Sequence, residues 1–213
     1  DIYLGQVKKL LPGLNAAFID VGSKKDGFLH YLDLGLYYKA LEKFTKICMS
    51  GSGDNMDFAK LKEKKKKKSG KIVETLKQGQ VILVQVSKEA ISTKGPRLCT
   101  EISFAGRYLV LVPFSEKVSV SQKIKSAEER NRLRKLIKSI KPDNFGIIIR
   151  TIAEGKSVAE LDADLKDLLS KWESIKKKLP KALPPTKLVS ELDKSSVILR
   201  DMLTEEFNNV YVN

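Results

Sequence analysis

Residues 15–30 constrain the fold more than any other segment, because two short apolar runs separated by a polar turn predict a pair of neighbouring β-strands. Side chains on a strand alternate between two faces, so one face of this pair is expected to be buried. The side chains expected on the buried face are Ala17, Ile19, Val21 and Leu29. The opposite face then carries Phe18 beside Asp20, and Phe28 beside His30. Two phenyl rings therefore lie outside the core on adjacent strands.

Exposed aromatic rings on a small curved sheet, with lysines around them, are a usual means of holding single-stranded nucleic acid without reading its sequence. Phe18 and Phe28 therefore predict a stacking platform for bases. The alternative is that both rings cover an interface between domains, which the alternation of side chains does not exclude.

The charge of the chain indicates a polyanionic partner. The chain contains 40 Lys and Arg against 26 Asp and Glu, which gives a formal net charge of +14. Nucleic acid is favoured over a membrane surface, because no apolar run approaches the roughly 18 residues that a membrane span requires, and no signal-peptide pattern opens the chain. The chain is therefore expected in the cytoplasm.

The cysteines predict ordinary thiols, because Cys48 and Cys99 lie far apart in no spacing typical of metal ligands. A disulfide framework or a zinc site within these residues is not expected. Since the chain begins at Asp1 without Met and stops on an apparent strand at 210–212, we expect it to be a fragment of a longer protein.

The first hundred residues predict a five-stranded barrel of the OB type with a large insertion. The expected strands are residues 2–11, 15–21, 27–30, 81–88 and 97–103. In the insertion, a helix is expected over 36–47, followed by five adjacent lysines at 64–68. Adjacent lysines repel one another, so this run predicts a mobile loop, which either follows RNA phosphates or is a solvated charge run without a specific role.

The pattern changes after residue 104 to a mixture of helices and strands. The expected elements are a second hairpin of residues 107–113 and 118–121, a helix over 127–140, a buried strand at 146–149, a helix over 195–207 and a strand at 210–212. Ser157 and Glu160 form a capping-box pair at the start of a long amphipathic helix, whose apolar seam is expected to face the core. Pro180 and Pro184-Pro185 predict a linker.

Arg150 and Thr151 come directly after the buried strand at 146–149. A guanidinium fork can bind two phosphate oxygens, while an adjacent hydroxyl and backbone N–H supply further donors. The pair therefore predicts a small phosphate socket, and the alternative is a surface ion pair of Arg150.

Short motifs follow one another along the chain in a recognisable order. They are Ile2-Tyr3-x-Gly5, Leu14-Asn15-Ala16-Ala17-Phe18-Ile19-Asp20-x-Gly22, Gly27-Phe28-Leu29, Gly79-Gln80-x-Ile82-x-Val84-Gln85-Val86, Thr93-Lys94-Gly95, Leu98-x-Thr100-x-Ile102-Ser103-x-Ala105-Gly106-x-Tyr108-Leu109-Val110-Leu111, Ile149-Arg150-Thr151 and Gly155-Lys156-Ser157. In order and spacing these motifs resemble the N-terminal part of the RNase E/G family of endoribonucleases. The resemblance spans nearly the whole chain apart from the insertion.

The resemblance implies an α+β chain in three parts. Residues 1–102 would be an OB-fold RNA-binding domain with a lysine-rich insertion at about 35–75, residues 103–184 a small α/β 5′-sensor domain, and residues 185–213 the start of an RNase H-like subdomain.

The resemblance also implies roles for single residues. The positions that contact single-stranded RNA in the family match Phe18, Phe28 and Lys94. The positions that form a pocket for the 5′-monophosphate match Gly106, Val110, Arg150 and Thr151. One departure is visible: the family often has two arginines after the position of Ser121, whereas this chain has Gln122 and Lys123. Lys123 is expected to join the phosphate pocket, where a lysine keeps one charge but lacks the guanidinium fork.

Cleavage in this family resembles metal-assisted hydrolysis, with Mg²⁺ held in a later subdomain, and a zinc link between protomers of a homo-oligomer would follow further on. Neither belongs to residues 1–213, so no catalytic or metal-binding residue is expected here. Asp162 and Asp164 stand two apart on a helix, where side chains do not share a face, and solvent exposure is expected for both.

We therefore expect a portion of an endoribonuclease that binds single-stranded RNA, preferably 5′-monophosphorylated, and is inactive alone. One alternative is a non-catalytic OB-fold RNA-binding module associated with translation or ribosomes. The other is a structural module whose basic surface docks an acidic protein partner.

Overall fold

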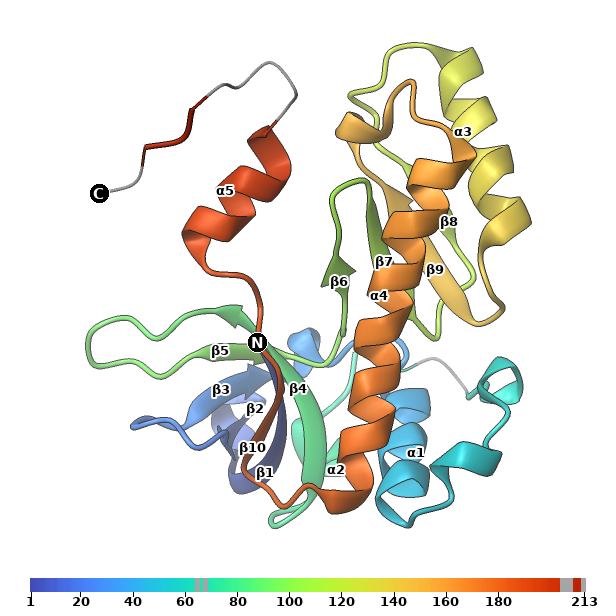
Figure 1. Ribbon diagram of the computed structural model, residues 1–213. Helices are drawn as coiled ribbons and strands as arrows, with labels where there is room; N and C mark the ends of the chain where they lie inside the picture. Colours follow the sequence, from blue (N-terminus) through green and yellow to red (C-terminus); the bar gives the residue numbers. More distant parts are fainter. Residues whose placement is uncertain (64–65, 67–68, 204–208, 212–213) are drawn as a thin grey trace.

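The computed structural model describes residues 1–63, 66, 69–203 and 209–211, and it shows a β-barrel beside a second sheet with helices packed against it (Figure 1). No helix among these residues is both long and apolar enough to cross a membrane.

The barrel contains the five strands that the sequence predicts. They are β1 (Ile2–Leu11), β2 (Ala16–Asp20), β3 (Gly27–His30), β4 (Val81–Lys88) and β5 (Arg97–Cys99). Pairing of β1 with β4 closes the barrel, and β3 runs parallel to β5. The fold class is therefore confirmed as an OB-type barrel followed by α/β segments. The bounds differ at two strands: β2 is one residue shorter at each end than the predicted 15–21, and the fifth strand ends at Cys99 instead of residue 103.

The core of the barrel follows the predicted alternation of side chains. Four side chains assigned to the buried face are at most 4% exposed: Ala17, Ile19, Val21 and Leu29. They pack with buried residues of the other strands, among them Val7, Ile82, Val84 and Leu98. Full burial of a Val, Leu or Ile side chain of this kind contributes about 1.5–3 kcal/mol.

The insertion after β3 packs into the molecule as well. Its main helix, α1 (Tyr38–Met49), lies two residues later than expected, and the short helix α2 (Ile72–Thr75) follows. The ring of Phe44 in α1 stacks on Trp172 with a centroid distance of 4.5 Å, and the ring of Phe58 lies 4.7 Å from that of Phe145. The insertion thus contributes to the core between the barrel and the second sheet.

The lysine run is only partly described by the structure. Residues 64, 65, 67 and 68 lie outside the described residues, so the expected mobile loop is not tested there. Lys66 does not fit that expectation. Its backbone N–H donates to the carbonyl of Leu36 at 2.8 Å, and its ammonium group lies 3.9 Å from the centre of the Tyr31 ring. These contacts hold this lysine against the barrel.

The second sheet has the strand order β6-β7-β9-β8. Its strands are β6 (Phe104–Ala105), β7 (Leu109–Pro113), β8 (Val118–Val120) and β9 (Phe145–Ile149). The predicted hairpin of β7 and β8 is wrong, because β9 lies between them, antiparallel to β7 and parallel to β8. The helix α3 (Ala127–Ile140) joins β8 to β9, and a helical connection of this length lets the chain return parallel to its own strand.

The long helix α4 (Val158–Lys178) begins at the predicted capping box of Ser157 and Glu160. Its core-facing side chains are Leu161, Leu165, Leu168, Trp172 and Ile175. Val158, the first residue of this helix and apolar like the seam, is 44% exposed.

The segment after α4 returns to the barrel. The strand β10 (Thr186–Val189) pairs antiparallel with β1, so the expected linker is a short 3-10 turn, Leu179–Lys181, and a few further residues. The helix α5 (Lys194–Met202) follows, and the remainder of the predicted helix, 204–207, lies outside the described residues. Val210 and Tyr211 form no strand, contrary to expectation, and Val212 is not described.

Candidate nucleic-acid interface

Phe18 and Phe28 lie directly opposite each other on β2 and β3. Their ring centroids are 6.1 Å apart in an edge-to-face arrangement, and both side chains are half-buried on the face that points away from the barrel core. The face assignment made from the sequence is therefore confirmed, although alternation alone could not show that the two rings touch.

The register of the sheet extends this pair into a row of four side chains. On one side, Phe18 pairs with Lys9 of β1, and on the other, Phe28 pairs with Arg97 of β5. Directly paired residues point to the same face, so a cation follows the aromatic pair at each end of the row. Lys9 and Arg97 were not singled out from the sequence, because their place depends on strand register.

A groove of about 710 Å³ opens beside the two rings. Its lining brings together the three residues expected to contact RNA with five neighbours: Phe18, Lys25, Asp26, Phe28, Thr93, Lys94, Gly95 and Arg97. The loop between β4 and β5 supplies Lys94. This loop is held against β3 by a hydrogen bond of 2.8 Å from the backbone N–H of Phe28 to the carbonyl of Pro96.

Gly95 is required for the close approach of this loop. A Cβ atom at Gly95 would lie 2.0 Å from the backbone carbonyl oxygen of Asp26, a distance that no side chain tolerates. The absence of a side chain therefore lets Lys94 stand at the rim of the groove.

Two of the cations around the groove are neutralised and two are not. The guanidinium of Arg97 donates to both carboxylate oxygens of Asp33, at 3.0 and 3.1 Å, and this bonding raises its pKa. Lys8 binds Asp26 at 2.9 Å. By contrast, no carboxylate of the described residues lies within 4.0 Å of the ammonium groups of Lys25 or Lys94, both exposed. These two lysines leave uncompensated positive charge beside the rings.

The five residues expected to hold a 5′-phosphate lie around β7, β9 and the segment after β8. The guanidinium of Arg150 donates to the carbonyl of Gly106 at 2.7 Å, and the hydroxyl of Thr151 lies 2.9 Å from that of Ser121. Val110 pairs with Ile148, the residue two before Arg150. Lys123 is exposed, and its backbone N–H donates to the hydroxyl of Ser121 at 3.3 Å.

The fork of Arg150 is already engaged by a residue that sequence reasoning missed. Its two terminal nitrogens donate to the two carboxylate oxygens of Asp201 in α5, at 2.9 and 2.8 Å. Arg200 also donates to Asp201, at 2.8 Å. No local pattern marks Asp201, because 51 residues separate it from Arg150.

Asp164 is a second residue whose role differs from the sequence prediction. Its carboxylate accepts hydrogen bonds from the backbone N–H groups of Arg107, Tyr108 and Leu109 at 2.9–3.0 Å. The expected solvent exposure is therefore wrong for Asp164, because this carboxylate caps the turn before β7. Asp162, two residues earlier in the helix, pairs with Lys166 at 2.6 Å.

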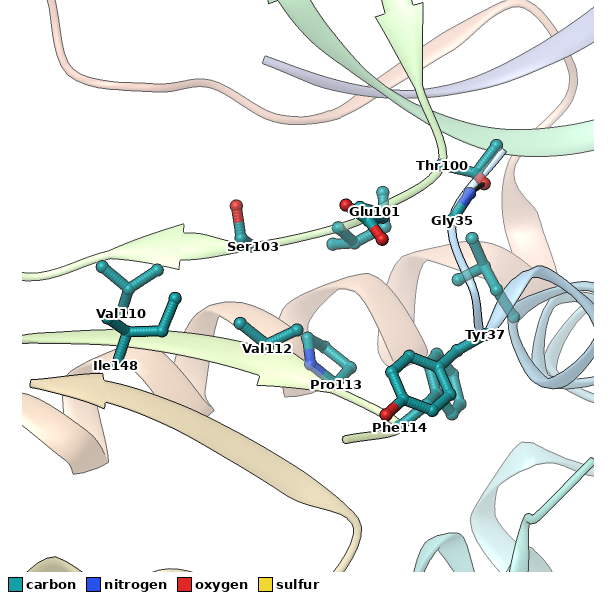
Figure 2. Close-up of a pocket in the computed structure, with 12 residues that line it drawn as sticks. Gly35, Tyr37, Thr100, Glu101, Ser103, Val110, Val112, Pro113, Phe114 and Ile148 are labelled. Carbon is teal, nitrogen blue, oxygen red and sulfur yellow. Dashed lines mark hydrogen bonds between the residues drawn. The ribbon is translucent and has the colours of Figure 1, made fainter. Parts of the chain in front are cut away.

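A smaller groove of about 300 Å³ runs between the second sheet and the first turn of the insertion (Figure 2). Val110 and Ile148 lie at one end of it, and Tyr37 and Phe114 lie at the other. Glu101 is the charged residue of its lining. The groove is therefore suited to apolar or planar groups and not to phosphate.

Within residues 1–63, 66, 69–203 and 209–211, no three His, Cys, Asp or Glu side chains lie close enough together to hold a metal ion. Cys48 and Cys99 are both free thiols, and burial raises the pKa of Cys48 to about 11.

This chain is an OB-type barrel joined to an α/β segment. The outer face of the barrel carries paired phenyl rings and lysines without a carboxylate partner in the part of the chain that the structure describes. Residues 103–213 match the model of the Ribonuclease E/G family. All of the chain aligns with Ribonuclease E of Nostoc sp. (strain PCC 7120), at 37% identity, and with Ribonuclease G of Escherichia coli (strain K12), at 35% identity. The chain belongs to the Ribonuclease E/G family. It spans 27% of the length of the first relative and 40% of the second.

Proposed function

We propose that this chain is the part of a cytoplasmic endoribonuclease that binds single-stranded RNA and inspects its 5′ end. The observation that carries the proposal is the row of Lys9, Phe18, Phe28 and Arg97 beside the exposed lysines of the groove. Every base has a face that can stack on a phenyl ring, and every nucleotide brings a phosphate for a lysine. Such a surface binds single strands of many sequences.

Arg150, Thr151, Gly106, Val110 and Lys123 are proposed to take the 5′-terminal phosphate. A guanidinium fork and a hydroxyl are donors suited to a monophosphate, and the family's 5′-sensing pocket lies at the matching positions. A lysine at position 123 supplies a point charge without a fork, so modest affinity for the phosphate is expected.

Cleavage is proposed to reside in a part of the relatives that this chain does not span, with Mg²⁺ as the expected cofactor and a homo-oligomer as the expected assembly of the full enzyme. The described residues contribute substrate binding to that reaction. They would fix the RNA strand and its 5′ end relative to a remote catalytic site.

The proposal is tested by replacing Phe18 or Phe28 with Ala and titrating a short unstructured RNA. Loss of one stacking ring is expected to weaken binding by about 1–3 kcal/mol. Leu183→Ala is a matched control, because Leu183 is 80% exposed and is not among the residues that line the groove. The fluorescence of Trp172, the single tryptophan of the chain, reports whether each variant is folded. Unchanged affinity in both phenylalanine variants would refute the proposal, and unfolding of either would favour the interface alternative.

A further inference from the structure

Asp201 binds the guanidinium group of Arg150, which the proposed function needs for binding phosphate. Both terminal nitrogens of Arg150 donate to Asp201, and one of them also donates to the carbonyl oxygens of Gly106 and Arg107, at 2.7 and 3.2 Å. The hydroxyl of Thr151 is shared with Ser121 at 2.9 Å. A planar carboxylate with two oxygens on a guanidinium fork has the geometry that two phosphate oxygens would adopt there.

Two guanidinium groups bind this carboxylate, those of Arg150 and Arg200, and a third is held at the end of the helix that carries it. Arg200 donates from its Nε atom to Asp201 and from Nη1 to the carbonyl of Ala105 in β6, beside which α5 stands (Figure 1). Arg107 donates to the carbonyl of Leu203, just after α5. The buried Nε of Arg107 has no hydrogen-bond partner among the described residues. Two guanidinium groups therefore share the single carboxylate of Asp201, and the guanidinium of Arg107 at the end of α5 has a donor that no described residue satisfies.

The charge balance favours a phosphate over a carboxylate at this place. Hydrogen bonds from Arg150 and Arg200 hold the pKa of Asp201 well below its usual range, so Asp201 carries one negative charge at neutral pH. The second carboxylate nearby, Asp164, is saturated by three backbone N–H groups. A terminal monophosphate carries up to two negative charges and three acceptor oxygens. It would match the guanidinium groups of Arg150 and Arg200 more fully than Asp201 does.

The helix that carries Asp201 is held by few apolar contacts. The apolar side chains of Ile198 and Met202 are 56% and 62% exposed. The side chains of Arg150 and Asp201 are themselves 28% and 29% exposed. A nine-residue helix is marginal in water without tertiary packing, so its release costs little beyond the polar contacts themselves.

We propose that Asp201 is a specificity-determining residue of the Arg150 site, an internal carboxylate that competes with the 5′-monophosphate of RNA for the guanidinium fork. This inference rests on the proposed function of Arg150. A 5′-hydroxyl end has no charge with which to displace Asp201, whereas a 5′-monophosphate does. Because only the displaced form binds phosphate, the apparent affinity for that end is reduced by the fraction of molecules in which Asp201 is released.

The test compares binding of one short RNA carrying a 5′-monophosphate or a 5′-hydroxyl to the full chain and to Asp201→Asn. The variant keeps the shape of the side chain and removes its charge. The preference for the monophosphate is expected to rise by about fivefold, at the low end of coupling between sites because the pair is partly exposed. Asp167→Asn is the matched control, since it removes one exposed charge of α4 that pairs with Lys171. Hydrogen exchange of the α5 amides is measured in parallel and is expected to increase when the monophosphorylated RNA binds.

The outcomes of this test distinguish the proposed 5′-phosphate sensor from the proposed competition by Asp201. If the unaltered chain prefers the monophosphate and Asp201→Asn does not increase the preference, the competition is refuted and the sensor stands. If only Asp201→Asn shows a preference, the competition stands and the unaltered chain is not a sensor. If neither prefers the monophosphate, both proposals fail. A preference that Asp201→Asn lowers would refute competition and assign Asp201 to the positioning of Arg150.

Discussion

At the scale of single residues, Asp164 ties the helix α4 to the turn before β7. Its carboxylate receives three backbone N–H groups, and Gly106 leaves the room for it, since a Cβ atom there would lie 2.5 Å from a carboxylate oxygen. The same turn offers the carbonyls of Gly106 and Arg107 to Arg150. One carboxylate therefore shapes the backbone around the proposed phosphate site.

Asp164→Asn is expected to destabilise the protein by about 2–3 kcal/mol, because an amide has one acceptor oxygen where the carboxylate has two, and it leaves backbone N–H groups without a partner. The free energy of unfolding in urea measures this loss. Asp162→Asn removes the same charge two residues away, where only a pair with Lys166 is lost, and is expected to cost at most about 0.5 kcal/mol. Equal costs for the two variants would contradict the capping role of Asp164.

At the scale of elements, local sequence patterns predicted the features that depend on neighbouring residues, such as a helix cap and the alternation of side chains on a strand. The cap of Ser157 and Glu160 spans one helical turn, and the alternation around Phe18 spans one strand, so both were visible in the sequence. The position of β9 between β7 and β8 could not be predicted from such local patterns. Only four residues, 114–117, separate β7 from β8, a length typical of hairpins, yet β7 pairs with β9, more than thirty positions later.

The residues of the candidate site also fall into those that local patterns predict and those that only tertiary packing brings together. The three residues Phe18, Phe28 and Lys94 were identified from alternation and motif, and the groove unites them. Lys9 and Arg97 join them through strand register, and Asp201 reaches Arg150 from a different helix. Such contacts depend on tertiary packing, for which a single sequence carries no periodic signal.

The cap of α4 makes a prediction about pH. Hydrogen bonds from the backbone N–H of Ser157, from Lys156 and from the Ser157 hydroxyl lower the pKa of Glu160 to about 2. Because the folded pKa lies below the usual value of 4.5, the charged cap stabilises the protein above about pH 4.5, and this contribution is lost as the pH falls toward 2.

Glu160→Gln is therefore expected to lower the free energy of unfolding at pH 7, with a difference from the unaltered chain that shrinks between pH 4.5 and 2. Urea unfolding at a series of pH values measures this difference. Glu173→Gln, near the other end of α4, serves as the control for the change in net charge. A difference that stays constant over the whole range would show that the carboxylate charge is not the cause.

At the scale of the whole molecule, one hydrophobic core lies between the barrel and the second sheet, in addition to the separate core inside the barrel. The cluster joins Leu4 of β1 and Leu83 of β4 to Leu111 of β7, with Phe44 of the insertion and Trp172 of α4 between them. The return of β10 to β1 closes the same unit from the other side. The groove beside Phe18 and Phe28 and the proposed phosphate site are thus parts of one packed unit, although 1–102 and 103–184 remain our proposed division into domains.

Phe44→Ala is expected to destabilise the barrel and the second sheet together, by about 3–5 kcal/mol, because a fully buried ring stacked on Trp172 is replaced by a cavity. Urea unfolding followed by Trp172 fluorescence reports the shared core, and hydrogen exchange of barrel amides such as that of Ile19 reports the barrel. Both measurements are expected to shift by the same free energy. Val73→Ala, in the same insertion but 42% exposed, is the control and is expected to cost under about 1 kcal/mol. A shift of the fluorescence transition that leaves barrel exchange unchanged would mean that the two sheets unfold independently and that the insertion stabilises only one of them.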